Sequence, residues 1–477
     1  MTKETVSSNP INKEATITNH EELHNGLGSE EVRINNHMAR TNTRWQNQNH
    51  SSNRNHDFYP GQLYGTESGK LFHAGKIMIV LVGLPATSKT LLAHSLERYC
   101  KWLGVVSRVF NLADYRRKFK DVPKEYFFGG ETSTKAIEVR KQIRKVSIND
   151  MKKFFQEENG QLAIFDAMNT QKMERRCIQE NFQCLNVNVL FVESIMTDKD
   201  LTERNIKLVM ETIKEGNDEF DKKIRYSLLN KMLTSKPSYE EIEDSEKLSY
   251  VKFNNFGKQI VVKNNHQGYL LNKLVFFLMN LRSGKGRIFF CSSNSIHQED
   301  ISNCLKSIYN RVIEQIKKED IVRRNFSPSL QEDDRPNSPI LTIWCEHKFQ
   351  LEEDSDIELI NKSQLRRMNL GAIEGLSEEE IEKQYPKEYK ESFEDLYHYR
   401  YPRAESYHDL AIRLEGLLLE LEHQQSDLLI FADESVLRIL YGYFMSSSCI
   451  EVPLLNFGKG EIVELSLKTF SKEIKKL

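Results

Sequence analysis

The sequence predicts two consecutive α/β domains, each built on a largely parallel sheet. Apolar runs of strand length, the first at residues 77–82, alternate with amphipathic stretches in which apolar residues recur at helical spacing. Such alternation is typical of parallel strands joined by right-handed helical crossovers. A short polar stretch at residues 282–286 separates two sets of this kind. Because no internal repeat relates the sets, we expect two different domains.

Composition narrows the class of protein. The 477 residues carry 67 Lys and Arg against 69 Asp and Glu, a net charge of -2. Because neither sign is in surplus, the composition gives no reason to expect a nucleic acid or membrane partner. A mean hydropathy of -0.57 and the lack of an apolar run of about 20 residues predict no membrane span. The amino terminus is polar, and the seven cysteines form no C-x-x-C pair. We therefore expect a cytoplasmic protein with reduced thiols.

Residues 1–70 are expected to form a disordered tail. The first sixty positions hold eleven asparagines among Ser, Thr, His and mixed charges, with almost no apolar periodicity. Such a segment buries too little apolar surface to offset the entropy of ordering.

The first domain is expected over residues 71–285. Its buried strands are predicted at residues 77–82, 105–112, 162–167 and 189–195. Leu92, Leu96, Tyr99 and Leu103 recur at helical spacing after the first strand and predict a helix there.

The second domain is expected over residues 286–477. Strands are predicted at residues 287–291, 341–345, 428–432 and 462–467, and helices at 407–423 and 436–445. The charged, Pro- and Ser-rich insert at residues 323–339 is expected to be a surface loop.

A phosphate-binding loop is predicted directly after the first strand. The octapeptide that begins at Gly83 and ends in Ser88, Lys89 and Thr90 leads into a helix, and that strand–loop–helix context is the one phosphate binding requires. Lys89 would reach the terminal phosphates of ATP, and the Thr90 hydroxyl would bind Mg²⁺. Ser88 replaces the usual second glycine; a positive φ there would cost about 1–2 kcal/mol. Asp166, at the end of a later strand, would hold the Mg²⁺ or its waters.

The order of the motifs GLPATSKT, VFNLADYRR, FDAMNT and FVESI resembles the bifunctional 6-phosphofructo-2-kinase/fructose-2,6-bisphosphatase family. The likeness runs from about residue 74 to 467. In the second half EEEIEKQYP, YHYRYPRAESYHDL and LLIFADESVLRILYGYF resemble that family's histidine-phosphatase domain, which has a phosphoglycerate-mutase-like fold. The resemblance implies ATP and Mg²⁺ as cofactors, fructose 6-phosphate or fructose 2,6-bisphosphate as ligand, and a homodimer formed through the kinase domains.

In the kinase half the resemblance implies both retained and lost positions. The retained nucleotide-site positions are Gly83, Lys89, Thr90, Asp166 and Asn205. Arginines that match the sugar-phosphate site are Arg116 or Arg117, and Arg140. The departures are Met168 for a threonine, Met196 for a cysteine, Met210 for a lysine and Lys223 for an arginine. Met210 is the most damaging, because a thioether supplies no charge to the transferring phosphoryl group. The Glu174-Arg175-Arg176 triplet is displaced by one residue, and neither arginine is assigned to the substrate.

In the phosphatase half the same resemblance implies an eroded active site. Ser293 stands at the histidine nucleophile and Ser292 at the arginine before it. Gln350, Asp433 and Arg367 take the places of a second arginine, a second histidine and, loosely, the acid. With Glu434 beside Asp433, the pocket should repel phosphate. Positions that match sugar-phosphate or regulatory nucleotide contacts remain at Arg400, Arg403, Tyr407 and Arg438, and plain surface charge is an equal alternative for them.

Three hypotheses follow from these residues. In the first, the phosphatase domain is inactive and the kinase domain binds ATP with little or no turnover, which makes the chain a regulatory pseudoenzyme or a very weak kinase. In the second, the chain is a working 6-phosphofructo-2-kinase in which a residue such as Lys207 compensates for Met210. In the third, it is a structural partner protein that binds no nucleotide.

Overall fold

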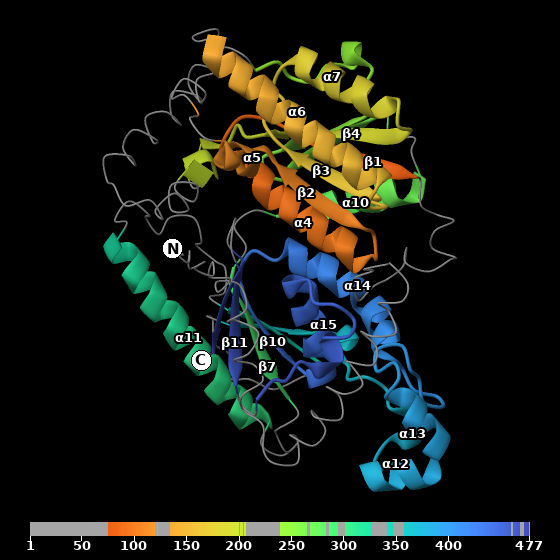
Figure 1. The fold of residues 1–477 in the computed structure, drawn as a ribbon. Helices are drawn as coiled ribbons and strands as arrows, with labels where there is room; N and C mark the ends of the chain where they lie inside the picture. The colour runs from red at the N-terminus through yellow and green to blue at the C-terminus, as the bar shows by residue number, and fades with distance from the viewer. Residues whose placement is uncertain are drawn as a thin grey trace, which may run out of the picture.

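The computed structural model describes most of both predicted domains. The described residues are 75–119, 122, 134–199, 201–203, 205–206, 239–264, 268–282, 286–293, 301–326, 341–346, 357–458, 461–467 and 472–476. The predicted tail lies outside them, as do Lys207, Met210, Lys223 and Gln350, whose assignments stay predictions. Figure 1 shows the two domains as two layered α/β units packed one against the other.

The first domain is built on a six-stranded sheet in the order β2-β3-β1-β4-β5-β6. All neighbouring strands run parallel except β5 and β6. The strands are β1 (Lys76–Val82), β2 (Ser107–Asn111), β3 (Leu162–Asp166), β4 (Val187–Ile195), β5 (Tyr250–Asn254) and β6 (Gln259–Lys263). The chain passes from β1 to β2 on one side and later to β4 on the other, so β1 ends at a topological switch point, where α/β sheets bind ligands.

Helices cover both faces of this sheet. They are α4 (Lys89–Trp102), α5 (Leu112–Lys118), α6 (Thr134–Gln156), α7 (Lys172–Gln183) and α10 (Gly268–Asn280), with a 3₁₀ turn η3 (Asp244–Glu246). Along β1, Ile77, Ile79 and Leu81 pack in a cluster with α4 and α10. The intervening residues, including Met78 and Val80, pack with α6 and α7. This alternation follows from the two-residue period of a strand buried on both faces.

The second domain is built on a six-stranded sheet in the order β12-β11-β7-β10-β8-β9. Its central strands β7, β10, β8 and β9 are parallel, whereas β11 and β12 are antiparallel to their neighbours. The strands are β7 (Ile288–Ser292), β8 (Leu341–Cys345), β9 (Ile357–Asn361), β10 (Asp427–Ala432), β11 (Ile462–Leu467) and β12 (Lys472–Lys476).

Helix α11 (Ile301–Phe326) covers one face of this sheet, and α14 (Tyr407–His423) and α15 (Glu434–Met445) cover the other. The shorter elements are α12 (Glu378–Gln384), α13 (Pro386–Ser392), η4 (Ser363–Leu365), η5 (Gly371–Ile373) and η6 (Val452–Leu454). Because α11 runs to Phe326, the prediction of a surface loop from residue 323 was wrong for its first four residues. The remainder of that insert lies outside the described residues.

The two domains share one apolar core. A single cluster of buried side chains runs from β1 and α4 of the first domain to α14, α15 and β10 of the second. The contact brings α4 against α15 and α10 against α14. Within the described part of the chain, each helix is too short or too polar to cross a bilayer.

Candidate functional site

The phosphate loop joins β1 to α4 through a backbone that needs special conformations. Gly83 has a φ of 142°, and a Cβ added there would lie 2.5 Å from the carbonyl oxygen of Ser194. Ser88 has a φ of 60° and a ψ of 21°, the left-handed conformation. Serine in place of glycine at position 88 therefore has the positive φ at which a side chain costs about 1–2 kcal/mol.

The three side chains predicted to serve the nucleotide meet at the start of α4. The Lys89 ammonium group donates to the Leu84 carbonyl at 2.5 Å and to Thr87 Oγ1 at 3.3 Å. Thr90 Oγ1 donates to Asp166 Oδ2 at 2.8 Å. A hydroxyl and a carboxylate are hard oxygen ligands of the kind Mg²⁺ prefers, and Mg²⁺ takes its other ligands from water and phosphate. The residues present therefore fit the ion.

Burial shifts the ionisation of both charged groups. Lys89 is 8% exposed and Asp166 5% exposed. Desolvation lowers the pKa of Lys89 to about 8, although the nearby Asp166 opposes that shift. Desolvation raises the pKa of Asp166, against the opposing effects of Lys89 and the Thr90 hydroxyl. Lys89 and Asp166 are thus a buried cation and a buried carboxylate at the carboxyl ends of neighbouring strands. An anionic ligand would neutralise the charge of the first, and a divalent cation would neutralise the charge of the second.

Two further residues support this site and were not singled out in the sequence. Asn111 Nδ2 donates to Asp166 Oδ2 at 2.9 Å, while Asn111 Oδ1 caps α5 by accepting from the Ala113 amide at 2.8 Å. Ser194 Oγ donates to the carbonyl of Thr87 at 2.7 Å and ties the loop to β4. Both lie inside the motifs VFNLADYRR and FVESI. The feature of the sequence that could have identified them is their position at the carboxyl ends of strands that neighbour β1 or β3.

The other predicted residues of the kinase half lie on separate elements. Arg116 and Arg117 lie on α5, and Arg140 lies on α6, which packs against α5. Arg117 is exposed and forms an ion pair with Asp114 at 2.5 Å. Asn205 is 9% exposed, and its Nδ2 is buried without a hydrogen-bond partner. The structure thus brings Lys89, Thr90 and Asp166 together, and the sugar-phosphate roles of the arginines stay predictions.

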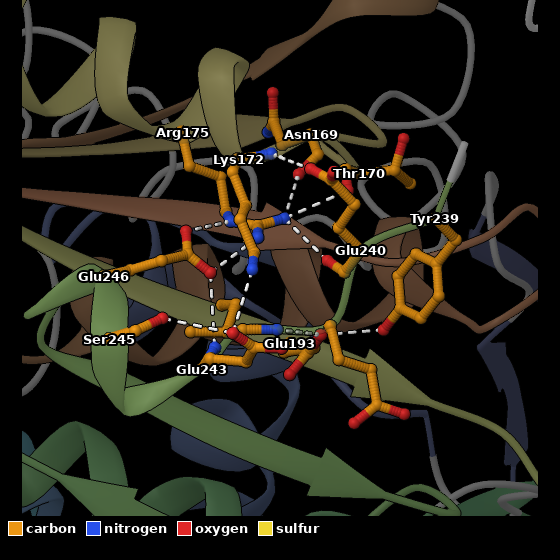
Figure 2. Close-up of polar contacts among 12 residues, drawn as sticks. Asn169, Thr170, Lys172, Arg175, Glu193, Tyr239, Glu240, Glu243, Ser245 and Glu246 are labelled. Atoms are coloured by element: carbon orange, nitrogen blue, oxygen red, sulfur yellow. Dashed lines mark hydrogen bonds and ion pairs between the residues drawn. The ribbon is translucent and has the colours of Figure 1, made fainter.

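Both arginines of the Glu174-Arg175-Arg176 triplet have protein partners. Figure 2 shows the Arg175 guanidinium at the centre of a polar network that holds residues 239–246 against the loop after β3. It is fully buried, forms two bonds to the Glu246 carboxylate at 2.7 and 2.9 Å, and donates to the carbonyl oxygens of Asn169, Thr170 and Glu240. Arg176 is 76% exposed and pairs with Glu180.

The network continues from this loop to the phosphate loop. Asn169 Nδ2 donates to the Leu81 carbonyl at 2.8 Å, and the Gly83 amide donates to the Met168 carbonyl at 2.9 Å. On the other side, buried Glu193 accepts from the Tyr239 hydroxyl at 2.7 Å and from the Ile242 amide at 3.0 Å. Arg175 therefore positions the loop that underlies Gly83.

In the second domain the degenerate positions meet at two parallel strand ends. Ser292 ends β7 and Ala432 ends β10, and the two residues are register partners. The Ser293 amide donates to the Ala432 carbonyl at 2.9 Å. Asp433 caps α15, since its Oδ1 accepts from the backbone amide and the hydroxyl of Ser435. The residues predicted at the nucleophile and second-histidine positions are thus neighbours, and neither side chain is an imidazole.

Arg438, one of the arginines predicted at this site, is neutralised within the protein. Arg438 donates to Glu434 Oε1 at 2.9 Å, to the Tyr407 hydroxyl at 2.7 Å and to the Leu455 carbonyl at 2.5 Å. Glu434 also accepts from the Phe457 amide at 3.1 Å. Desolvation raises the pKa of Tyr407, opposed by Arg438. A phosphate here would compete with a carboxylate that is already in place.

Three predicted arginines of this domain lie at the surface. Arg400 is 59% exposed and pairs with Asp409 at 2.5 Å. Arg367 forms an ion pair with Glu374, and its neighbour Met368 donates its amide to Ser435 Oγ at 3.3 Å, which places this segment beside the start of α15. Arg403 is exposed with a φ of 61°.

The fold and the two strand-end sites define a phosphate-loop kinase-type domain followed by a histidine-phosphatase-type domain. Sequence comparison agrees, since the pattern of the 6-phosphofructo-2-kinase family matches residues 64–285 and that of branch 1 of the histidine phosphatase superfamily matches residues 349–477. The chain belongs to the 6-phosphofructo-2-kinase/fructose-2,6-bisphosphatase family. It is a homologue of the bifunctional enzymes of fructose 2,6-bisphosphate metabolism, as the motif order indicated.

Three relatives are similar to this chain over most of its length. A Saccharomyces cerevisiae protein named "Putative 6-phosphofructo-2-kinase/fructose-2,6-bisphosphatase YLR345W" is 40% identical over 97% of this chain and 98% of its own length. A 6-phosphofructo-2-kinase/fructose-2,6-bisphosphatase from Gallus gallus is 30% identical over 84% of each chain. A fructose-2,6-bisphosphatase from S. cerevisiae is 28% identical over 84% of this chain and 88% of its own.

Proposed function

We propose that this chain is a cytoplasmic, homodimeric member of its family in which the kinase-like domain binds Mg·ATP and the bisphosphatase domain is inactive. Its fructose 6-phosphate site is eroded, so that the protein acts as a regulatory pseudoenzyme or a very weak kinase. The observation that carries the nucleotide half of the proposal is the cluster of Lys89, Thr90 and Asp166 at the end of β1 and β3.

In this proposal the chain's own residues bind and orient ATP. Loop amides and the start of α4 face the phosphates, where the positive end of the helix dipole favours negative charge. Lys89 supplies a cation, and Thr90 with Asp166 would hold the metal. Bound Mg²⁺ would neutralise charge on the β- and γ-phosphates. The eroded sugar side rests on Met168, which is 41% exposed beside the loop, and on the replacements at 196, 210 and 223.

The inactive phosphatase half is argued from charge. A phosphohistidine mechanism needs a nucleophilic imidazole and cations around the transferring group. Ser293 and Asp433 supply neither, and the ion pair with Glu434 neutralises Arg438. Removal of one such preorganised group commonly costs about 100- to 1000-fold in rate, so several losses together should reduce turnover below detection.

An active 6-phosphofructo-2-kinase is the alternative, and one observation favours it. The Thr90–Asp166 contact and the buried Lys89 preserve the chemistry of the phosphate site despite the strain at Ser88. In that case the chain would make fructose 2,6-bisphosphate from ATP and fructose 6-phosphate.

Three measurements on the purified full chain test the proposal. Calorimetric titration with Mg·ATP should show binding that Lys89→Ala removes, and absence of binding at millimolar nucleotide would favour a purely structural protein. Fructose 2,6-bisphosphate labelled at the 2-phosphate should leave no label on the protein, and Ser293→His alone should not restore labelling, because the surrounding cations stay absent. Acid-labile label on the wild-type protein would refute the inactive phosphatase, and a coupled kinase assay decides between pseudoenzyme and kinase.

A further inference from the structure

The helix that carries the phosphate-site residues is also the helix that joins the two domains. Lys89 and Thr90 form its first turn, and Arg98 and Trp102, on its last turns, face the second domain. Figure 1 shows α4 on the side of the first domain that lies against α14 and α15. Arg98 lies nine residues after Lys89, which is about 13 Å along the helix axis.

A buried ion pair fixes the far end of this helix to the second domain. Arg98 Nη2 lies 2.6 Å from Glu422 Oε1, with side-chain exposures of 8% and 0%. The Tyr443 hydroxyl donates to the same carboxylate oxygen at 2.7 Å. The guanidinium carbon lies 5.2 Å from the centroid of the Tyr443 ring and 5.5 Å from that of Phe444. Buried charges of this kind tolerate little displacement, because each is costly without its partner.

A second set of contacts restrains the same turns of α4. Trp102 packs edge-on against Tyr443, with ring centroids 5.7 Å apart. Tyr99 stacks on Phe277 of α10 at 4.4 Å, and its hydroxyl donates to Glu415 of α14 at 3.3 Å. The helix therefore has the first sheet on one side and α14 with α15 on the other.

We propose that the second domain serves as the platform that holds α4, and with it Lys89 and Thr90, in the nucleotide-binding position. Arg98 and Glu422 are the positioning residues of this arrangement. The inference rests on the proposed nucleotide binding and gives the second domain a role that does not require phosphatase chemistry. A helix transmits displacement along its axis, and small misplacements of binding groups are costly.

The position of the phosphatase pocket supports this separation of roles. α15 begins at the degenerate pocket, where Asp433 caps it, and reaches α4 at Tyr443, ten residues or about 15 Å further along. The residues at the pocket end are not among those that contact Arg98. Loss of the phosphatase site is thus compatible with a retained platform.

The test uses the full chain and a matched pair of variants. Glu422→Gln removes the charge that Arg98 faces across the domain boundary. Asp427→Asn is the control, since Asp427 forms a buried pair with Arg287 at the same 2.6 Å, within the second domain. Calorimetric titration with Mg·ATP should give a dissociation constant raised at least about fivefold by Glu422→Gln, a typical size for coupling between sites. The control should change it by less than about twofold, although both variants lower the melting temperature.

Two further readouts separate positioning from a general loss of stability. Amide exchange in the first turn of α4, residues 89–92, should become faster in Glu422→Gln and not in Asp427→Asn. The double variant Arg98→Met with Glu422→Met should recover wild-type affinity within about threefold, because an apolar pair can replace a buried ion pair.

The outcomes are distinguishable. A wild-type chain that binds no Mg·ATP refutes the proposed function itself. A wild-type chain that binds, with equal affinity and equal exchange in Glu422→Gln and the control, refutes the platform. If Glu422→Gln does not fold, Tyr443→Phe decides, because it removes the hydroxyl that bonds to Glu422 and leaves the aromatic ring in place: at least a twofold weaker affinity supports the platform, and unchanged affinity and exchange refute it.

Discussion

Replacing Lys89 by methionine should stabilise the nucleotide-free protein and abolish nucleotide binding. Lys89 is 8% exposed, and burial lowers its pKa from the usual 10.5 to about 8. Methionine has a similar length and carries no charge to desolvate. The substitution therefore removes the cost of burying an ammonium group and also removes the cation that phosphate would meet.

The magnitude follows from the two pKa values. A fall from 10.5 to about 8 is worth roughly 3 kcal/mol at about 1.4 kcal/mol per pKa unit. The unfolded lysine keeps its proton up to pH 10.5, whereas the folded lysine releases it near pH 8, so the unfolded state binds more protons between these values. Stability should therefore rise with pH over this window, and the penalty is fully present below pH 8. Loss of the bonds to Leu84 and Thr87 offsets about 1–2 kcal/mol, which leaves Lys89→Met more stable by roughly 1–2 kcal/mol at pH 7.

The assay is denaturant unfolding at pH 7 with and without Mg·ATP. Lys101→Met is the control, because Lys101 lies on the same helix and pairs with Glu97 at the surface. In the wild type, Mg·ATP affinity should fall about tenfold from pH 7 to pH 9, as the charged fraction of a group with a pKa near 8 drops from about 0.9 to 0.1. A Lys89→Met protein that is less stable than wild type, or that still binds Mg·ATP, would refute the reasoning.

Four other substitutions test separate parts of the two candidate sites. Ser88→Gly should raise the free energy of unfolding by about 1 kcal/mol, because glycine adopts the left-handed backbone without strain. It should raise kcat/KM less than Met210→Lys does, because a missing cation costs about 2–4 kcal/mol of transition-state stabilisation. A coupled assay that shows the reverse order would place the main defect in the phosphate loop. Arg175→Lys should lower the unfolding free energy by about 2–4 kcal/mol because lysine cannot form the forked contact; a loss of sugar-phosphate affinity without a loss of stability would make Arg175 a ligand instead. Glu434→Gln should strengthen inorganic phosphate binding to the second domain by releasing Arg438, and an unchanged titration would mean that other groups close the pocket.

Sequence patterns identified the central strands and main helices, but not every strand. The strands at β8 and β11 and the helix α14 begin and end where periodicity placed them, because continuous apolar runs and capped amphipathic stretches leave little choice. The interior strand β5 and the edge strands β6, β9 and β12 were missed. Their short runs carry neither a clean alternation nor a continuous apolar stretch, so pairing with a neighbour decides their structure.

The site was predictable where the local sequence context defines the role of a residue. Lys89 and Thr90 follow a buried strand and a short loop and begin a helix, and that strand–loop–helix context predicts that they lie at the phosphate-binding end of the sheet. The role of Arg175 was not predictable, because its partner Glu246 lies 71 residues away along the chain, and an arginine suits a phosphate and a carboxylate equally. The pairing of Arg438 with Glu434 is visible as an i, i+4 spacing; what the spacing alone does not show is that Arg438 also contacts the Tyr407 hydroxyl and Glu434 the Phe457 amide.

In the second domain, the residues that hold the fold differ from the strand-end positions that the family resemblance assigns to catalysis. The second domain is held by side chains inside its sheet and on α14 and α15, such as Phe290 and Leu414, which are fully buried. The positions that the family resemblance assigns to its chemistry lie at strand ends, among them Ser293 and Asp433, which contribute little to that core. Residues at these positions can therefore differ while the core stays intact, and Asp433 serves as a helix cap. In the first domain two of the phosphate-site residues, Lys89 and Thr90, lie on α4 itself, so that changes in this helix affect the nucleotide site and the domain contact together. If the second domain positions that helix, selection on nucleotide binding alone suffices to retain a phosphatase fold that no longer needs its phosphatase residues.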